Sequence, residues 1–261
     1  MTVITLTTDF GLRDGFGGVL KGVIWSICPE ARIADITHTI APQNVLEGAL
    51  ALARAAPFFP AGTVHLAVVD PGVGTRRRPM VARLGGHYFV GPDNGLFTAM
   101  IEDAHRRELA EEYIHLDKPE FWLPGVSQTF HGRDIFAPVS AHLAKGTALS
   151  IMGTPMADPV LLDLPRPERT GTGWNSHAVI IDTFGNITTD LRAEQLEGRA
   201  VSFSVRGRQV NGLVESYGWR RPGELVALVD SEGFIEIAVV NGSAAQTLGA
   251  LVGDTIQAIY E

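Results

Sequence analysis

The sequence predicts an α/β protein with two domains: an N-terminal domain on a mainly parallel sheet, and a smaller C-terminal domain that is β-rich and barrel-like. Three observations predict this class. Apolar β-branched runs alternate with helically spaced apolar residues before residue 70, a stretch rich in Pro and Gly occupies 164–173, and short alternating segments follow. We therefore expect domains at 1–163 and 174–261, joined by a linker at 164–173.

The N-terminal elements begin with residues 2–8, which are short, apolar and β-branched like a buried strand. The next predicted elements are a helix at 16–27, a strand at 32–36, a helix at 45–56 and a strand at 63–69. This alternation favours a parallel sheet, and in such sheets ligands gather outside the carboxyl ends of the strands. Asp9 and Asp70 each follow a predicted strand, so both are expected at that edge.

The C-terminal region has a different texture, with short alternating runs separated by Gly, Asn and Ser turns. The predicted strands lie at 176–182, 200–206, 208–214, 225–229, 234–240 and 255–260. Several short strands at such spacing are typical of a small barrel or sandwich.

Composition limits the classes of function. The net charge of -8 disfavours non-specific binding to the phosphates of nucleic acids, so no nucleic-acid partner is expected. No apolar run reaches the roughly 18 to 20 residues of a membrane span, and no basic region precedes an apolar segment at the N-terminus. We expect a cytoplasmic protein without a membrane partner. The single cysteine, Cys28, lies in an apolar stretch and is expected to be a buried thiol.

Candidate chemistry is concentrated in segments where Asp, Asn, His or Arg lies beside glycine, which lets the backbone bend close to a ligand. These segments are 8–11 (TDFG), 70–78 (DPGVGTRRR), 91–97 (GPDNGLF), 129–138 (TFHGRDIFAP) and 182–189 (DTFGNITT).

Other motif interpretations are weaker. Asp9-Phe10-Gly11 lacks the remaining protein-kinase motifs, and the segment after Asp70 lacks the Gly-Lys-Ser/Thr ending of a phosphate loop. The eight histidines are scattered, with no metal-binding spacing, so we predict no metal. Taken singly, each candidate also has a structural interpretation, such as a turn cap for Asp70, a solvated charge run for residues 76–78 or a core ring for Phe184.

Together and in order, these segments resemble the SAM hydroxide adenosyltransferases, enzymes that hydrolyse S-adenosyl-L-methionine (SAM) and are related to the fluorinase and chlorinase. The resemblance extends from Thr7 to residues 231–238. It implies that Asp70, Arg77 and His131 are catalytic residues that surround an attacking water. It also implies that SAM is the substrate, that no cofactor is used, and that adenosine and methionine are the products.

The chemistry explains those residue types. The ribose C5′ of SAM already carries a sulfonium leaving group, so the difficulty lies in supplying an oxygen nucleophile in line with the C–S bond. A carboxylate or an imidazole can accept the proton of water, and a guanidinium favours hydroxide while keeping its own charge. Whether Asp70 or His131 accepts the proton stays open at this stage.

The resemblance also implies substrate-binding residues. Asp9 matches the aspartate that accepts hydrogen bonds from both ribose hydroxyls, and Phe184 matches the ring that stacks on the base. The other positions that match the binding segments are Asp182, Asn186, Ser231, Glu236 and Val239. The halogenating relatives carry arginines where this chain has Glu232 and Val239, and they lack the water-activating histidine, so the hydrolase is favoured.

Two alternatives remain: a halide-using SAM enzyme, and a non-catalytic sensor of adenosine or SAM. The catalytic trio argues against a sensor, which has no need to polarise water. The resemblance further implies a homotrimer, with each site between the N-terminal domain of one subunit and the C-terminal domain of the next. The physiological purpose, the rate and the exact substrate range are not readable from the sequence.

Overall fold

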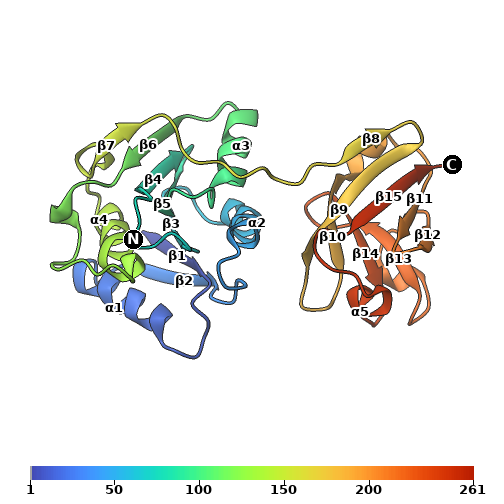
Figure 1. The fold of residues 1–261 in the computed structure, drawn as a ribbon, viewed down its shortest axis with the longest axis horizontal. Helices are drawn as coiled ribbons and strands as arrows, with labels where there is room; N and C mark the ends of the chain where they lie inside the picture. Colours follow the sequence, from blue (N-terminus) through green and yellow to red (C-terminus); the bar gives the residue numbers. More distant parts are fainter. Residues whose placement is uncertain (1) are drawn as a thin grey trace. The chain divides into compact units, whose positions relative to one another are not determined.

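The computed structural model describes residues 2–261, and the chain divides into two compact units, one that ends at Leu164 and one that spans Pro165–Glu261 (Figure 1). Part of the expected linker belongs to the second unit, because strand β8 (Glu168–Thr170) pairs with β9 (Gly173–Ile181). Each unit has its own hydrophobic core.

The N-terminal unit is built on a seven-stranded sheet with the order β2-β1-β3-β5-β4-β6-β7. Its strands are β1 (Val3–Thr8), β2 (Arg32–Thr37), β3 (Val64–Val68), β4 (Pro79–Leu84), β5 (His87–Pro92), β6 (Glu111–His115) and β7 (Thr154–Met156). The neighbours from β2 to β5 are parallel, and the pairs from β5 to β7 are antiparallel.

The antiparallel part begins at a hairpin that sequence reasoning missed. The two residues Gly85 and Gly86 connect β4 to β5, and Gly85 has a φ of 58°, as a tight hairpin turn requires. A two-residue connection can only join antiparallel strands, because a parallel pair needs a crossover. The predicted α/β class is therefore confirmed, and the sheet is parallel around β1 and β3, where the site candidates lie.

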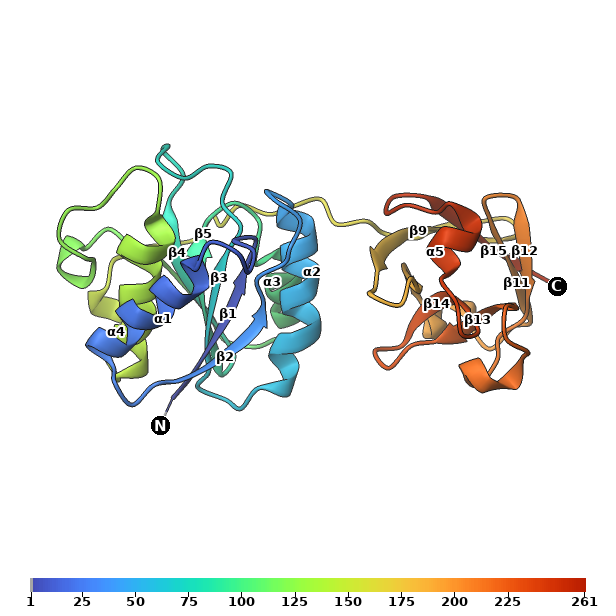
Figure 2. The same cartoon turned by 90° about the horizontal axis from the view of Figure 1, so that it is seen from below.

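Helices cover both faces of this sheet (Figure 2). Helices α1 (Phe16–Ile27) and α4 (Ala137–Ala144) cover one face, and α2 (Val45–Ala55) and α3 (Thr98–Arg106) cover the other. The apolar stripes of these helices and the inward faces of the strands form two clusters of buried side chains. Among the described residues, every helix falls short of the length and hydrophobicity that a membrane span requires.

The C-terminal unit is a nearly closed antiparallel barrel with the order β12-β11-β15-β9-β10-β14-β13. Its further strands are β10 (Ile187–Arg192), β11 (Val201–Val205), β12 (Arg208–Asn211), β13 (Leu225–Val229), β14 (Phe234–Val239) and β15 (Thr255–Tyr260), with a short helix α5 (Ala244–Leu248). A bridge between Leu213 and Ala227 brings the two ends of the order together. The predicted β-rich, barrel-like class is confirmed.

Candidate active site

Asp70 and Arg77 form a buried ion pair at the carboxyl edge of the parallel strands. Nε of Arg77 donates to Oδ1 of Asp70 at 3.1 Å, and Nη2 donates to Oδ2 at 2.5 Å. The two side chains are only 6% and 5% exposed. The third guanidinium nitrogen, Nη1, is buried and has no hydrogen-bond partner among the described residues. A buried donor without a partner is costly, so this atom suits an acceptor supplied by a ligand or a water.

His131 completes the arrangement, since its Nδ1 lies 3.1 Å from Nη2 of Arg77. A guanidinium can only donate, so Nδ1 must accept, and the neutral ring then carries its proton on Nε2. Burial, followed by the charge of Arg77, lowers the pKa of His131 below its usual value. The imidazole is therefore neutral near pH 7, with an N–H available for donation.

The local backbone brings these residues together from distant parts of the chain. The loop after β3 turns back at Gly74, where an added Cβ would lie 2.2 Å from the carbonyl oxygen of Gln128, just before His131. Arg77 also lies over the ring of Phe136, 5.3 Å from its centroid. Phe136 ends a π-helical turn, Gly132–Phe136, which directly follows His131. Such turns are frequent at functional sites because they redirect neighbouring side chains.

Asp134 orders the segment that carries His131, a role that sequence reasoning missed. Its buried carboxylate accepts from the backbone N–H of Ser127 at 2.9 Å and from Nε of Arg133 at 2.6 Å. Its backbone carbonyl accepts from the N–H of Leu123. The only sequence signal for this role was its position three residues after His131.

The three consecutive arginines have different environments. Arg76 is exposed, Arg77 forms the buried pair, and Arg78 donates to Asp93 at 2.8 Å and to Asp158 at 2.9 Å. A solvated charge run therefore describes only the first. The family resemblance singled out Arg77, but local sequence patterns did not predict these three environments, because they depend on residues up to eighty positions away.

Asp9 follows β1, next to the strand that leads to Asp70. Thr8 is the register partner of Val68 in the β1–β3 pair, so the residues that follow these two strands emerge at the same sheet edge. The carboxylate Oδ2 of Asp9 accepts from the backbone N–H of Gln43 at 2.8 Å. The side chain remains partly exposed, which leaves oxygen lone pairs for a ligand.

In the C-terminal unit, Asp182 organises the loop between β9 and β10. Oδ1 accepts from the backbone N–H groups of Phe184 and Asn186, both at 2.9 Å, and Oδ2 accepts from the Asn186 amide at 3.1 Å. Gly185 has a φ of 83°, and a Cβ there would lie 2.0 Å from the Ser243 hydroxyl. The loop is therefore tightly held against the N-terminus of α5.

Phe184 lies at the tip of this ordered loop and is 77% exposed. The backbone of Phe184 is fixed by hydrogen bonds, but its ring is exposed to solvent. Such an exposed aromatic ring is unusual for a core residue and typical of a binding surface. The interpretation of Phe184 as a core ring is therefore wrong for this unit taken by itself.

The remaining predicted binding residues lie on or near β14. Ser231 is exposed in the turn before this strand. Glu236 is 5% exposed and accepts from the hydroxyl of Tyr217 at 2.6 Å, and burial and this carboxylate raise the pKa of Tyr217. Val239 is 6% exposed and belongs to the barrel core. Within this unit, Val239 therefore offers little surface to a ligand, and its binding role stays a prediction.

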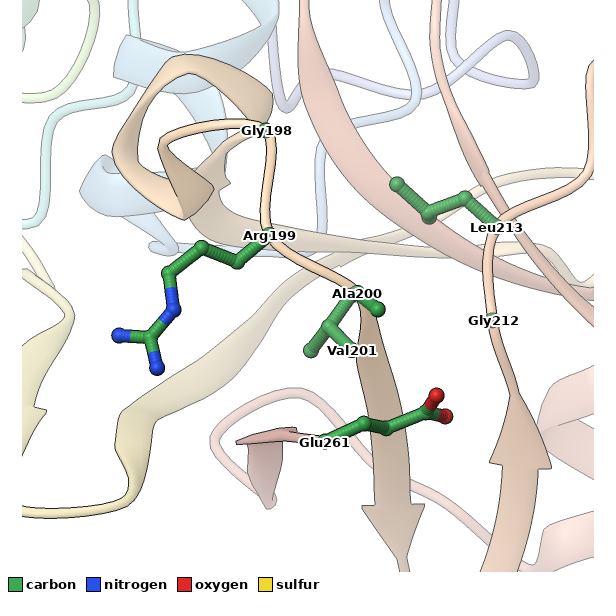
Figure 3. A pocket seen from close by; sticks show the side chains of 7 residues that line it. All are labelled: Gly198, Arg199, Ala200, Val201, Gly212, Leu213 and Glu261. Carbon is green, nitrogen blue, oxygen red and sulfur yellow. The ribbon is translucent and has the colours of Figure 1, made fainter.

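The cavities and clusters of the described residues offer no competing centre. No three His, Cys, Asp or Glu side chains in residues 2–261 gather as a metal group. A hollow of about 330 Å³ lies in the C-terminal unit, between the start of β11 and the end of β12 (Figure 3). Its two charged side chains, Arg199 and Glu261, point apart, and it contains none of the predicted site residues.

Comparisons with known proteins agree with this geometry. Residues 4–153 match the SAM hydroxide adenosyltransferase N-terminal domain, and residues 176–257 match the SAM hydroxide adenosyltransferase C-terminal domain. The two matches fall in the two structural units.

Similar proteins span nearly the whole chain. An (R)-S-adenosyl-L-methionine hydrolase of Salinispora tropica is 42% identical, with 97% of this chain and 96% of the relative covered. A hydrolase of the same name from Thermus thermophilus is 39% identical, with 97% and 98% covered. A fluorinase of Nocardia brasiliensis is more distant, at 27% identity with 98% and 96% covered.

The fold is also similar to a solved structure. The crystal structure of an uncharacterized conserved protein from Thermotoga maritima superposes with a TM-score of 0.91 at 36% identity, covering 99% of this chain and 100% of the other. By domain matches that cover both units and by full-length relatives, the chain belongs to the SAM hydroxide adenosyltransferase family.

Proposed function

We propose that this protein hydrolyses S-adenosyl-L-methionine to adenosine and L-methionine, with water attacking the ribose C5′. Family membership and the hydrolase relatives support this reaction. The observation that carries it is the buried Asp70–Arg77 pair with His131 at its side and one unpartnered guanidinium nitrogen. This arrangement offers both donors and an acceptor to one small oxygen nucleophile.

The balance of the reaction is simple. The water oxygen forms a bond to C5′ while the C5′–S bond breaks, and the bonding electron pair neutralises the sulfonium to the thioether of methionine. No general acid is needed, because the departing group leaves as a neutral thioether. The water must lose one proton, so positioning and an acceptor for that proton supply the catalysis.

The donor and acceptor inventory assigns the roles. Nη1 of Arg77 and the Nε2–H of neutral His131 donate hydrogen bonds to the water oxygen, while a carboxylate lone pair of Asp70 accepts the proton. His131 is the weaker acceptor, because its Nδ1 already accepts from Arg77. The guanidinium also favours developing hydroxide character, since it keeps its charge throughout.

Substrate contacts come from both units. Asp9 accepts hydrogen bonds from the two ribose hydroxyls, and the exposed ring of Phe184 stacks on adenine. Asp182 and Asn186 hold the Phe184 loop in its binding conformation. Ser231 contributes to the methionine end.

The same proposal extends to Glu236 and Val239, which act from beneath the binding surface because both side chains are buried. The protein uses SAM without a further cofactor or metal, binds no nucleic acid or membrane, and works in the cytoplasm as a homotrimer. In the trimer, each site takes Asp9 and the catalytic trio from one subunit and the Phe184 loop from the next. Sizing of the purified protein tests this assembly, and a monomer that is active would contradict it.

The deciding experiment is incubation of the pure protein with SAM in halide-free ¹⁸O water, with mass spectrometry of the products. Adenosine with ¹⁸O at its 5′ oxygen, together with free methionine, establishes hydrolysis at C5′. Turnover only after chloride or fluoride is added would instead assign a halide-using enzyme. Intact SAM recovered from a tight complex would assign a sensor.

A further inference from the structure

His38 is a buried histidine that the proposed reaction does not use. It directly follows β2, whose neighbour β1 leads to Asp9, and its residue is 6% exposed. Adjacent parallel strands therefore deliver His38, Asp9 and Asp70 to the same sheet edge.

Two hydrogen bonds connect His38 to the backbone on both sides of Asp9. Nδ1 of His38 lies 2.8 Å from Oγ1 of Thr8, and the carbonyl of His38 accepts from the N–H of Gly11 at 2.7 Å. Oγ1 of Thr8 in turn accepts from the N–H of Phe10 at 3.2 Å. The residues before and after Asp9 are thus held, while its own carboxylate is partly exposed.

The other side of the imidazole is also constrained. Nε2 lies 3.2 Å from Oδ1 of Asp35, although it is not aligned for a good hydrogen bond. Oδ2 of Asp35 accepts from Lys21 at 2.5 Å. Helix α1 approaches the ring so closely that a Cβ at Gly17 would lie 2.9 Å from Nε2. The ring therefore has little freedom to move away from Thr8.

We propose that His38 is a positioning residue for the substrate site: through the hydrogen bond of its ring with Thr8, which in turn accepts from Phe10, it presets the backbone that aims the carboxylate of Asp9 at the ribose. The inference rests on the proposed function, in which Asp9 binds the ribose hydroxyls. An ordered carboxylate binds better because less conformational entropy is lost when the ligand arrives.

The chain provides a matched control three residues earlier on β1. Oγ1 of Thr5 lies 2.8 Å from Nδ1 of His65, the same pair of atoms at the same distance as in the Thr8–His38 bond. This bond is buried within the sheet and does not touch the segment around Asp9. Thr5→Val therefore removes an equivalent hydrogen bond without affecting the substrate site.

The kinetic test compares His38→Ala, His38→Asn, Thr8→Val and Thr5→Val. We expect His38→Ala and Thr8→Val to raise the KM for SAM about tenfold with kcat within about twofold, because ribose contacts are made equally in the ground and transition states. His38→Asn places an amide near Nδ1 and should recover most of the affinity. The double variant should be no worse than either single one. Equal KM increases in Thr5→Val would overturn the inference.

Hydrogen exchange separates this inference from the proposed function. Exchange at the amide of Phe10 should accelerate in His38→Ala and stay unchanged in Thr5→Val, whatever the protein does to SAM. The amide of Gly11 donates to the backbone carbonyl of residue 38 and keeps this partner in both variants. Wild-type protein that fails to hydrolyse SAM but shows this exchange pattern would contradict the function alone. Active protein in which His38→Ala alters neither exchange nor KM would refute the positioning role alone.

Discussion

The polar side chains of the two units differ in their burial and in their hydrogen-bond partners. In the N-terminal unit, Asp70 and Arg77 form a buried ion pair in which Nη1 has no partner among the described residues, and a neutral His131 lies beside them. In the C-terminal unit, the carboxylate of Asp182 accepts hydrogen bonds from within its own loop. The exposed side chain there is the aromatic ring of Phe184.

This contrast separates chemistry from recognition. A buried ion pair with one free donor is suited to act on a small polar species, because low polarity strengthens its interactions. An exposed ring on an ordered loop is suited to bind a flat apolar surface such as a nucleobase. Variants in the two units should therefore fail in different ways.

The largest expected effect is on turnover in the N-terminal unit. We expect His131→Ala to lower kcat by about 10²- to 10³-fold, the range for loss of a preorganised hydrogen-bond donor to the reacting oxygen, while SAM still binds. Single-turnover kinetics and calorimetric titration with SAM measure the two quantities. Asp70→Ala should behave alike. Loss of binding together with turnover in both variants would show that these residues form a binding wall.

The next effect is on affinity in the C-terminal unit. Phe184→Ala should weaken adenosine and SAM binding by about 1 to 3 kcal/mol, the usual contribution of a ring stacked on a base. Thermal unfolding should be unchanged, because the side chain is 77% exposed. Phe184→Tyr is the matched control and should retain affinity. A large fall in kcat at saturating SAM would break the proposed division between the units.

Acid should affect the N-terminal unit first. Burial, followed by the charge of His87, lowers the pKa of His65 to about 3. Below about pH 6.5, His65 is therefore protonated in the unfolded chain but stays neutral in the folded chain. Stability is then complete above about pH 6.5 and is lost as the pH falls towards 3, by about 2 kcal/mol near pH 5. Urea unfolding between about pH 7 and pH 5 measures this loss.

A control variant isolates the histidine in that experiment. His65→Gln keeps a polar side chain and should reduce the dependence on pH over this range without abolishing it, because the pKa values of His87, His131 and His142 are lowered as well. The lowered pKa values of Asp35 and Asp134 contribute only at lower pH, since their stabilising effect is lost below the ordinary carboxylate range. An unchanged slope in His65→Gln would refute the assignment.

The smallest effect concerns an exposed ion pair of the barrel. Arg206 donates to both oxygens of Asp254, at 2.8 and 3.0 Å, on the protein surface. Arg206→Ala should lower stability only slightly, because solvent screens such pairs. Denaturant midpoints measured with and without 1 M salt test this, because the Debye length at 1 M is only about 3 Å and the ion pair is then screened. A large loss of stability in Arg206→Ala would mean that the barrel is stabilised by ion pairs, as the N-terminal site is by the Asp70–Arg77 pair.

Several features were predictable because their causes are local. Periodicity identified β1, α1, β2, α2 and β3 to within about two residues, and short alternating runs identified most barrel strands. The positions of Asp9 and Asp70 at one edge followed from strand order alone. By contrast, β4 to β7 and β10 went unassigned, since their sequence patterns are weak. Two of their pairings are hairpins, β4–β5 and β9–β10, and the pairs β4–β6 and β6–β7 join segments further apart in the chain.

What the sequence determined by itself is the α/β and barrel classes and the family resemblance, and through that resemblance the proposed catalytic trio. Tertiary structure decided that Arg77 forms a buried pair while Arg76 is exposed, that Asp182 serves its own loop, and that Val239 is buried. It also placed Asp134 against the segment that carries His131, and His38 against Thr8. The physical reason is that burial and hydrogen-bond partners are set by contacts between distant segments, which local patterns do not encode.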